Sequence, residues 1–268
     1  DTDSLSEAGL VKHWREVEAA DRKELKQFLD QQIFKLRHIN SLDTDEGSFV
    51  DAIWIRKWKR MPDGTYIIKC RLCARGYLDC QKHLIPTRST TATRLSQRIL
   101  VSVSVLLGFD LESWDVSGAF LKGFNFDRLA EIAAKLGHSL PKRKVLLKPP
   151  ANVWRHFNDL GSKNLSIRLQ NHHEYFLEFL KAMYGLVDAP LAWQQCLHEF
   201  LIDDLQGQQS LFDENFFIWF NAGCSVQALA TAHVDDNATA GDKPWLTKSH
   251  AHFERKFGNV TRQTLPFN

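Results

Sequence analysis

His233-Val234-Asp235-Asp236 decides the fold when it is taken together with Asp115-Val116-Ser117-Gly118-Ala119-Phe120-Leu121. The two stretches supply three acidic side chains in apolar settings far apart in the chain. Carboxylates are the groups that hold Mg²⁺, a hard cation that takes few protein ligands and leaves its other positions to phosphates and water. Two adjacent acids taken alone are more typical of a solvated turn, and a short motif is only a hypothesis until its context is known.

Two further motifs lie in order with the acidic stretches. Lys69-Cys70-Arg71-Leu72-Cys73-Ala74-Arg75-Gly76-Tyr77 comes before the first, and Lys181-Ala182-Met183-Tyr184-Gly185-Leu186-Val187-Asp188-Ala189-Pro190-Leu191-Ala192-Trp193 lies between the two. In this order the chain resembles the reverse transcriptase domain of copia-type LTR retrotransposon Pol polyproteins. That family carries a basic K-x-R-L-V-A-K-G strand, then D-V-x-x-A-F-L-x-G, L-Y-G-L-K-Q-A-P-R-x-W and Y-V-D-D. The resemblance runs from about Val50 to the C-terminus, and more faintly back to Trp14.

The order of elements favours an α+β fold, with strands in runs and helices in pairs. The resemblance implies the fingers and palm of a right-hand polymerase, with an antiparallel palm sheet backed by helices and the thumb absent or truncated. We expect residues 1–49 to form a helical lead-in and 50–268 the fingers–palm domain. Within that domain, the fingers would lie mainly in 50–108 and the palm mainly in 109–268.

The resemblance also implies a function. It predicts an RNA-directed DNA polymerase that adds deoxynucleotides to a primer 3′ end by two-metal nucleotidyl transfer, with two Mg²⁺ ions that Mn²⁺ can replace. Its partners would be an RNA or DNA template with primer, deoxynucleoside triphosphates, and other Pol segments such as RNase H and integrase. One alternative is a decayed or co-opted copy that binds nucleic acid without polymerising. Another is a fragment that only serves assembly of a larger polyprotein.

The acidic stretches supply the predicted catalytic and metal-binding residues. We expect Asp115 and Asp235 to bind both metals directly, with help from the Val116 carbonyl, and Asp236 to lie nearer the primer terminus. Repulsion between such carboxylates makes sense when cations neutralise them. By resemblance, Phe120 stacks under the deoxyribose and excludes a 2′-hydroxyl; the alternative is an ordinary core phenylalanine.

The predicted nucleotide-binding residues come from the other two motifs. Lys69 and Arg71 are two apart on an expected strand, so both point to one face, where they can clamp a triphosphate. An exposed strand face without a ligand is the alternative. The resemblance places Tyr184, Gly185 and Asp188 in the nucleotide pocket.

The chain departs from the family pattern at several positions. Asp188 stands where the family has glutamine, and Leu191 where it has arginine. An acid that faces a triphosphate is unfavourable, so Asp188 counts against catalysis. The polar stretch 237–241 replaces an apolar return strand, and His233 replaces a tyrosine. We therefore expect the arm that carries the acid pair to be loosely held.

Composition and charge set further limits. The chain has 268 residues, is 44% apolar, and carries a net charge of +2. Residues 54–100 hold eleven Lys or Arg and two acids, a local net charge of +9, so the remainder carries −7. This segregation suits phosphate binding by one part and metal binding by another, or is simply a solvated face. No apolar run approaches the ~20 residues that span a bilayer.

From the start of the chain and its cysteines we expect an intracellular protein. The chain begins at Asp1 without a methionine or signal peptide, so we expect a piece of a longer protein in a cytoplasmic particle or the nucleus, not a secreted one. Five cysteines without secretory context favour reduced thiols. Cys70, Cys73, Cys80 and His83 have zinc-like spacing, but two residues three apart on a strand face opposite sides.

Local patterns predict the individual elements. Helices are expected at 20–38, 90–107 (capped by Thr91 or Thr93), 127–137 (capped by Asp127), 191–205 and 246–257. Strands are expected at 52–59, 65–74, 109–116, 144–148, 215–220 and 226–234, with a turn at Met61-Pro62-Asp63-Gly64. The stretch 152–171 is poorly patterned and predicts an insertion or loop, and 175–183 is compatible with strand or helix.

Overall fold

The computed structural model describes residues 3–42, 47–61 and 63–264. The chain forms two compact units. Unit 1 is built from residues up to Thr87 and from Phe124–Ala189, and unit 2 from Arg88–Gly123 and from Pro190 onward. Residues 124–189 group with the N-terminal part of the chain. The assignment of the names fingers and palm stays a prediction.

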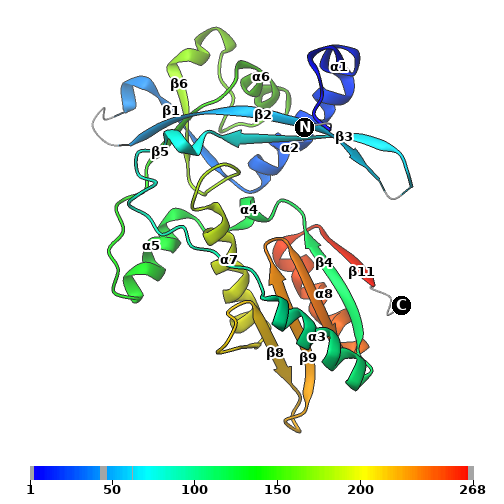
Figure 1. Ribbon diagram of the computed structural model, residues 1–268. Coiled ribbons are helices and arrows are strands. Elements are labelled where there is room, and N and C mark those ends of the chain that lie inside the picture. The colour runs from blue at the N-terminus through cyan, green and yellow to red at the C-terminus, as the bar shows by residue number, and fades with distance from the viewer. Residues whose placement is uncertain (1–2, 43–46, 62, 265–268) are drawn as a thin grey trace. The chain divides into compact units, whose positions relative to one another are not determined.

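Unit 1 contains a five-stranded sheet in the order β1-β6-β5-β2-β3 (Figure 1). Its neighbours pair antiparallel, except that β2 and β5 are parallel. The strands are β1 (Phe34–His38), β2 (Ser48–Arg60), β3 (Tyr66–Ala74), β5 (Val145–Lys148) and β6 (Tyr175–Phe179). The helices are α1 (Glu7–Lys12), α2 (Trp14–Asp30), α5 (Phe126–Lys135) and α6 (Ala151–Asp159), with 3-10 turns at Ile39–Ser41, Gly76–Leu78 and Leu169–Glu174.

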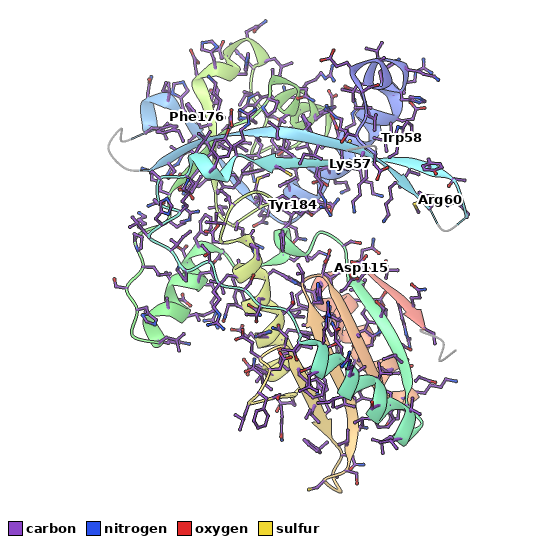
Figure 2. All side chains as sticks on the ribbon, viewed as in Figure 1. Lys57, Trp58, Arg60, Asp115, Phe176 and Tyr184 are labelled. Atoms are coloured by element: carbon purple, nitrogen blue, oxygen red, sulfur yellow. The ribbon has the colours of Figure 1, made fainter. Side chains whose placement is uncertain are left out.

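The β2–β3 hairpin of unit 1 alternates between buried and exposed side chains, as a half-buried pair of strands must. Its inner face packs against the N-terminal helices, where Val17 of α2 meets Ile68 and Cys70 of β3. Trp54 and Trp58 pack against the same cluster, and Trp58 is marked in Figure 2. The hairpin therefore has one face fixed in a core and one face left to solvent.

Unit 2 contains a six-stranded antiparallel sheet in the order β11-β4-β10-β9-β8-β7. The strands are β4 (Asp110–Val116), β7 (Gln208–Gln209), β8 (Phe216–Phe220), β9 (Val226–His233), β10 (Asp236–Gly241) and β11 (Val260–Thr264). The helices are α3 (Arg94–Leu107), α4 (Ala119–Lys122), α7 (Ala189–Glu199), which continues as a π-turn at Phe200–Asp204, and α8 (Lys243–Phe257).

Helices cover both faces of the unit 2 sheet. On one face, Leu100 of α3 packs with Leu111, Phe216, Leu229 and Ala240. On the other face, the ring of Trp114 lies 5.0 Å from that of Phe253 in α8. Full burial of one such side chain stabilises the fold by about 1.5–3 kcal/mol, so these two layers fix the positions of β4 and β10.

The α+β architecture and most elements match the expectations, but three local predictions are wrong. The first helix ends at Asp30, and Phe34–His38 is a strand, because F-K-L-R-H alternates with period two. The stretch 152–171 includes α6, whose Val153, Trp154 and Phe157 share a buried face. Asn125, not Asp127, caps α5.

Thr93 caps α3, as one of the two expected residues. The turn between β2 and β3 includes Pro62, which lies outside the described residues. Within 3–42, 47–61 and 63–264, no helix combines the length and apolar character that a bilayer span requires.

Candidate active site

The three predicted catalytic acids lie at one end of the neighbouring strands β4 and β10. Asp236 lies directly opposite Asp115 in the antiparallel register. Residues opposite each other on such strands share a face, with Cβ atoms about 4.5–5.5 Å apart. Val234 and Asp235 form the two-residue turn that joins β9 to β10, and the Val116 amide donates a hydrogen bond of 3.0 Å to the Asp235 carbonyl. Asp115 is marked in Figure 2.

The three carboxylates act on one another electrostatically. Burial raises the pKa of Asp236 above its ordinary value, and the charges of Asp235 and then Asp115 raise it further, while His233 opposes them. A bound cation would relieve this repulsion.

The arrangement has a limit as a metal site. In the part of the chain that the structure describes, no three His, Cys, Asp or Glu side chains are grouped so that they could hold a metal ion. The donors nevertheless suit Mg²⁺, which is commonly bound by one or two carboxylates together with substrate phosphates and water. Binding of Mg²⁺ by these carboxylates therefore stays a prediction.

The β9–β10 turn is held in a strained conformation. Val234 has φ of 58°, which is costly for a β-branched residue, by about 1–3 kcal/mol. The indole of Trp193 in α7 donates a hydrogen bond of 2.6 Å to the Val234 carbonyl. This bond was not predicted from the sequence. It helps to fix the backbone of the turn at the residue before Asp235.

The expectation that this arm is loosely held is wrong. β10 pairs along its whole length with β9 on one side and β4 on the other. Asn237 and Thr239 are buried, and the Asn237 amide donates to the Trp114 carbonyl at 3.4 Å. Small polar side chains suit this central strand because they fit between two neighbours and still satisfy their hydrogen bonds.

The helix after β4 contributes an expected and an unexpected side chain. Phe120 is half-buried on α4, five residues after Asp115, and its expected contact with a sugar ring stays a prediction. Lys122 on the same helix is half-buried; burial lowers its pKa, and the charge of Asp115 partly offsets that effect. Sequence analysis missed Lys122, although a basic residue seven positions after a candidate metal ligand was visible.

The predicted nucleotide-binding cations lie together in unit 1. Lys69 and Arg71 are exposed on one face of β3, as expected. Lys57 of β2, which is labelled in Figure 2, lies directly opposite Lys69 in the register. Three cations therefore share this outer face. Like charges directly opposite on a sheet destabilise it, which makes the face suited to an anion. The guanidinium of Arg71 lies 5.1 Å from the ring centroid of Tyr184, in cation–π contact.

The segment of Tyr184 and Gly185 is docked against the end of β3. The Ala74 amide donates a hydrogen bond of 2.8 Å to the Tyr184 carbonyl. Gly185 has φ of 94°, and a Cβ there would lie 2.0 Å from the Ala74 carbonyl oxygen. A Cβ on Gly76 would lie equally close to the Gly185 oxygen. The close backbone approach thus requires both glycines and places Tyr184 beside Arg71.

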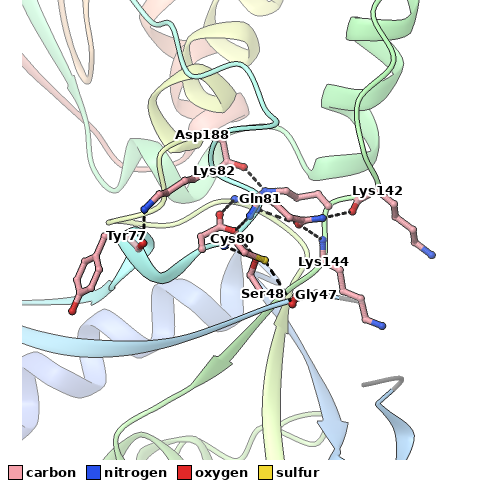
Figure 3. A network of polar contacts seen from close by, with 11 residues as sticks. Gly47, Ser48, Tyr77, Cys80, Gln81, Lys82, Lys142, Lys144 and Asp188 are labelled. Atoms are coloured by element: carbon pink, nitrogen blue, oxygen red, sulfur yellow. Dashed lines mark hydrogen bonds and ion pairs between the residues drawn. The ribbon is translucent and has the colours of Figure 1, made fainter. Parts of the chain in front are cut away.

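Asp188 lies in a buried polar network rather than at an open surface (Figure 3). Its carboxylate accepts a charged hydrogen bond of 2.9 Å from Arg143, whose guanidinium also lies 2.6 Å from Asp79. Burial alone would raise the pKa of Asp79, but Arg143 and Ser48 outweigh it and hold that pKa below its ordinary value. Asp188 is therefore neutralised by a cation that sequence analysis did not identify.

Two residues of the basic segment and the cysteine set have other surroundings than the candidate site. Arg56 forms an ion pair with the buried Asp21 and stacks over Trp54. Cys224 is exposed. Cys70 and Cys73 face opposite sides of β3. Cys70 is buried and lies opposite Arg56 in the register, and Cys73 is half-buried and lies opposite Ile53.

The structure thus groups the predicted site residues in two sets. Unit 2 holds Asp115, Val116, Phe120, Asp235 and Asp236, and unit 1 holds Lys69, Arg71, Tyr184, Gly185 and Asp188.

Comparisons with known proteins give one sequence relative. The chain is 27% identical over 205 residues to the Retrovirus-related Pol polyprotein from transposon RE1 of Arabidopsis thaliana. The match covers 74% of this chain and 12% of that protein, so the chain spans a small part of its relative's length. This similarity supports an origin in a retrotransposon Pol polyprotein. No protein-family model matches the chain.

Among solved structures, apo telomerase from Candida tropicalis, truncated from its C-terminal domain, aligns with a TM-score of 0.38 and 9% identity. The alignment covers 94% of this chain and 55% of that one. A TM-score of this size does not define a shared fold.

Proposed function

We propose that the chain is the reverse transcriptase part of a retrotransposon Pol polyprotein, an RNA-directed DNA polymerase that extends a primer on an RNA or DNA template. The observation that carries the proposal is the pairing of Asp115 with Asp236 on neighbouring strands, with Asp235 on the strained turn between β9 and β10. The similarity to a transposon Pol polyprotein is independent support.

In this proposal, Asp115, Asp235, Asp236 and the Val116 carbonyl would hold two Mg²⁺ ions, or Mn²⁺ in their place, with substrate phosphates and water as the remaining ligands. Two such ions supply activation of the primer 3′-hydroxyl and stabilisation of the leaving pyrophosphate. Asp236 lies opposite Asp115 in the register, and Asp235 lies in the turn directly before it. The Trp193 indole keeps the turn in place through the Val234 carbonyl.

The side chains of unit 1 provide the charges for the deoxynucleoside triphosphate. Lys69 and Arg71 bind its phosphates, and the Tyr184 ring limits the positions that the Arg71 guanidinium can take. The proposed role of Phe120, as the resemblance implies, is to reject a 2′-hydroxyl by steric conflict. Gly185 and Asp188 contribute by holding the segment that carries Tyr184, Gly185 through its approach to β3 and Asp188 through Arg143.

Primer extension on an oligo(dT)–poly(rA) template with Mg²⁺ or Mn²⁺ tests the proposal. We expect incorporation by the unmutated chain and none above background by Asp115→Asn or Asp235→Asn. Asp203→Asn is the matched control, because Asp203 is an exposed acid of the same unit. Incorporation that survives in both site variants would place the activity elsewhere and refute the assignment.

A protein that binds nucleic acid without polymerising is the second candidate. Asp188 and the polar stretch 237–241 favour it on sequence grounds, yet Asp188 is paired with Arg143 and the stretch forms a central strand. Absence of incorporation with retained, salt-sensitive binding of primer–template would establish this candidate instead. Absence of both would leave a role in the assembly of a larger polyprotein, which interacts with RNase H or integrase segments rather than with a template.

A further inference from the structure

Most of the apolar side chains of helix α3 are exposed to solvent rather than packed in the core. Its buried positions are Ser96, Leu100 and Ser104. Its outward positions include Leu95, Val105 and Leu106, which are 67%, 62% and 81% exposed. Ile99, Val101 and Leu107 of the same helix are exposed as well. A helix on the surface of a sheet normally shows the opposite pattern, with apolar residues inward and polar ones outward.

The orientation of the helix is fixed by specific bonds. The Ser96 hydroxyl donates a hydrogen bond of 2.5 Å to Asp213, which lies outside the helix. Thr93 caps the N-terminus, and its amide donates to Asp213. Rotation of the helix would break the two hydrogen bonds to Asp213 and withdraw Leu100 from the core of unit 2, so the apolar stripe stays outward.

The charges on the helix suit a second helix of the same kind in antiparallel orientation. Arg94 and Arg98 lie in the first half, the helix contains no acidic residue, and its last turn has no basic residue. The C-terminal end of a helix carries partial negative charge, equivalent to about half an elementary charge. An antiparallel copy would place each Arg94 beside the other copy's last turn, where that charge attracts it.

The side-chain sizes are self-complementary in the same arrangement. Leu95, Ile99, Ser102 and Leu106 are spaced four, three and four residues apart and form one stripe. With a two-fold axis beside Ile99 and Ser102, Leu95 of one copy faces Leu106 of the other. Ser102 is exposed and small, so it allows close approach at the centre.

We propose that the outer face of α3 is a dimerisation surface, on which two copies of this chain pair α3 with α3 in antiparallel orientation about a two-fold axis. Symmetric pairing of one patch with itself is the usual geometry of homodimers. A helix of 14 residues is about 21 Å long, which is short for the ~800 Å² that each partner of a stable complex buries. The dimer is therefore reversible and depends on protein concentration.

Sedimentation velocity of the 268-residue chain over a wide concentration range measures the dimer directly. We expect Leu106→Lys to raise the dimer dissociation constant at least about tenfold, or about 1.4 kcal/mol, because it places a second cation beside Arg94 of the other copy in an apolar contact. Leu136→Lys is the matched control, since Leu136 is a leucine 72% exposed at the end of α5. A chain that stays monomeric at every concentration, or a dimer that Leu106→Lys leaves intact, would overturn the proposal.

Cross-linking separates this surface from any other pairing. In a Cys80→Ser, Cys224→Ser background, which removes the two exposed thiols, Ser102→Cys places a thiol beside the two-fold axis. A short bis-maleimide should join two copies of that variant, and should not join copies of Ser225→Cys, which is equally exposed in the turn between β8 and β9. Equal cross-linking of both variants, or a persistent dimer with cross-linking of neither, would contradict the α3 pairing.

Discussion

Glu24 is a buried acid in the core of unit 1. Its side chain is 6% exposed, and its Oε1 atom makes no hydrogen bond. Burial raises the pKa of Glu24 to about 7, although a backbone hydrogen bond from Leu72 and the charges of Arg71 and Lys69 lower it. A carboxylate in such a place costs folding free energy whenever it is ionised.

The Glu24 side chain therefore makes the stability of unit 1 depend on pH. Because its pKa of about 7 lies above the ordinary value of 4.5, the folded state binds the proton more tightly. The resulting stability is fully present below pH 4.5 and is lost as the pH rises through about 7. Glu24→Gln should remove this dependence and raise the free energy of unfolding at pH 8 by up to about 3 kcal/mol. At pH 4.5 the two proteins should be close to equal.

Urea unfolding at about pH 5 and about pH 8, on either side of the folded-state pKa, measures the effect. Glu16→Gln is the control on the same helix, because the Glu16 side chain is 61% exposed. If Glu24→Gln shows the same difference between the two pH values as the unmutated chain, Glu24 is not the group that titrates.

Asp188 shows why a departure from a family pattern has to be judged with its partners. The carboxylate is buried and paired with Arg143. Arg143 also pairs with Asp79, and that ion pair would remain if Asp188 were replaced. Asp188→Gln, which restores the residue usual in the family, should destabilise the chain by about 2–3 kcal/mol, because one charge-assisted hydrogen bond of a buried cation is lost. It should not increase primer extension.

Thermal unfolding and primer extension, run together, test both statements, with Asp203→Gln as the exposed control. Higher incorporation at unchanged stability would instead show that Asp188 impairs a nucleotide pocket.

At the level of elements, short-range sequence patterns were sufficient to predict a helix or strand where the segment itself contains the alternation, spacing or capping residues that define it. The β2–β3 hairpin, α3 with its Thr93 cap, and α8 follow from alternation, helical spacing and capping residues. Phe34–His38 was missed because its apolar residues continue the spacing of the preceding helix. β10 was judged too polar because the fit of Asn237 and Thr239 depends on strands on either side of them.

The candidate site was predictable to the same extent. The motif residues Lys69 and Arg71 lie on one face as the period of a strand requires. The opposition of Asp236, rather than Asp235, to Asp115 depends on strand register, which a single sequence does not define. The contacts of Arg143 with Asp188 and of Trp193 with Val234 were not predicted, because the partners are distant in the chain and form no recognisable sequence pattern.

The docking of residues 184–186 on the end of β3 gives a prediction for that element. Gly185→Ala should destabilise unit 1 by more than about 3 kcal/mol, because it combines a positive φ with a Cβ 2.0 Å from a backbone oxygen. Gly64→Ala is the matched control: it has φ of 84° but no atom within 4 Å of the added Cβ. Gly64→Ala should lower the free energy of unfolding by only about 1–2 kcal/mol, which is the cost of a left-handed backbone conformation for alanine. Similar costs in urea unfolding would refute the close approach.

Across the whole molecule, charge is distributed unevenly along the chain. Residues 54–100 have a net charge of +9 in a chain whose total is +2. Some of these cations are occupied within unit 1, since Arg56 pairs with Asp21 and Arg75 with Asp51. Lys69 and Arg71 extend from the outer face of β3, with Lys57 beside them on β2. If this face binds a phosphate backbone, counterions are released and affinity falls with salt.

Primer–template binding should therefore weaken steeply between about 50 and 200 mM salt. The double variant Lys57→Gln, Lys69→Gln should bind more weakly and lower the slope of log K against log salt by nearly two, since each phosphate contact on a duplex contributes about 0.9. Lys12→Gln, Lys23→Gln removes the same charge from exposed positions on α1 and α2 and should leave the slope unchanged. Fluorescence anisotropy with a labelled primer–template gives both slopes. Equal slopes for the two double variants would show that net charge, rather than the outer face of the hairpin, binds the nucleic acid.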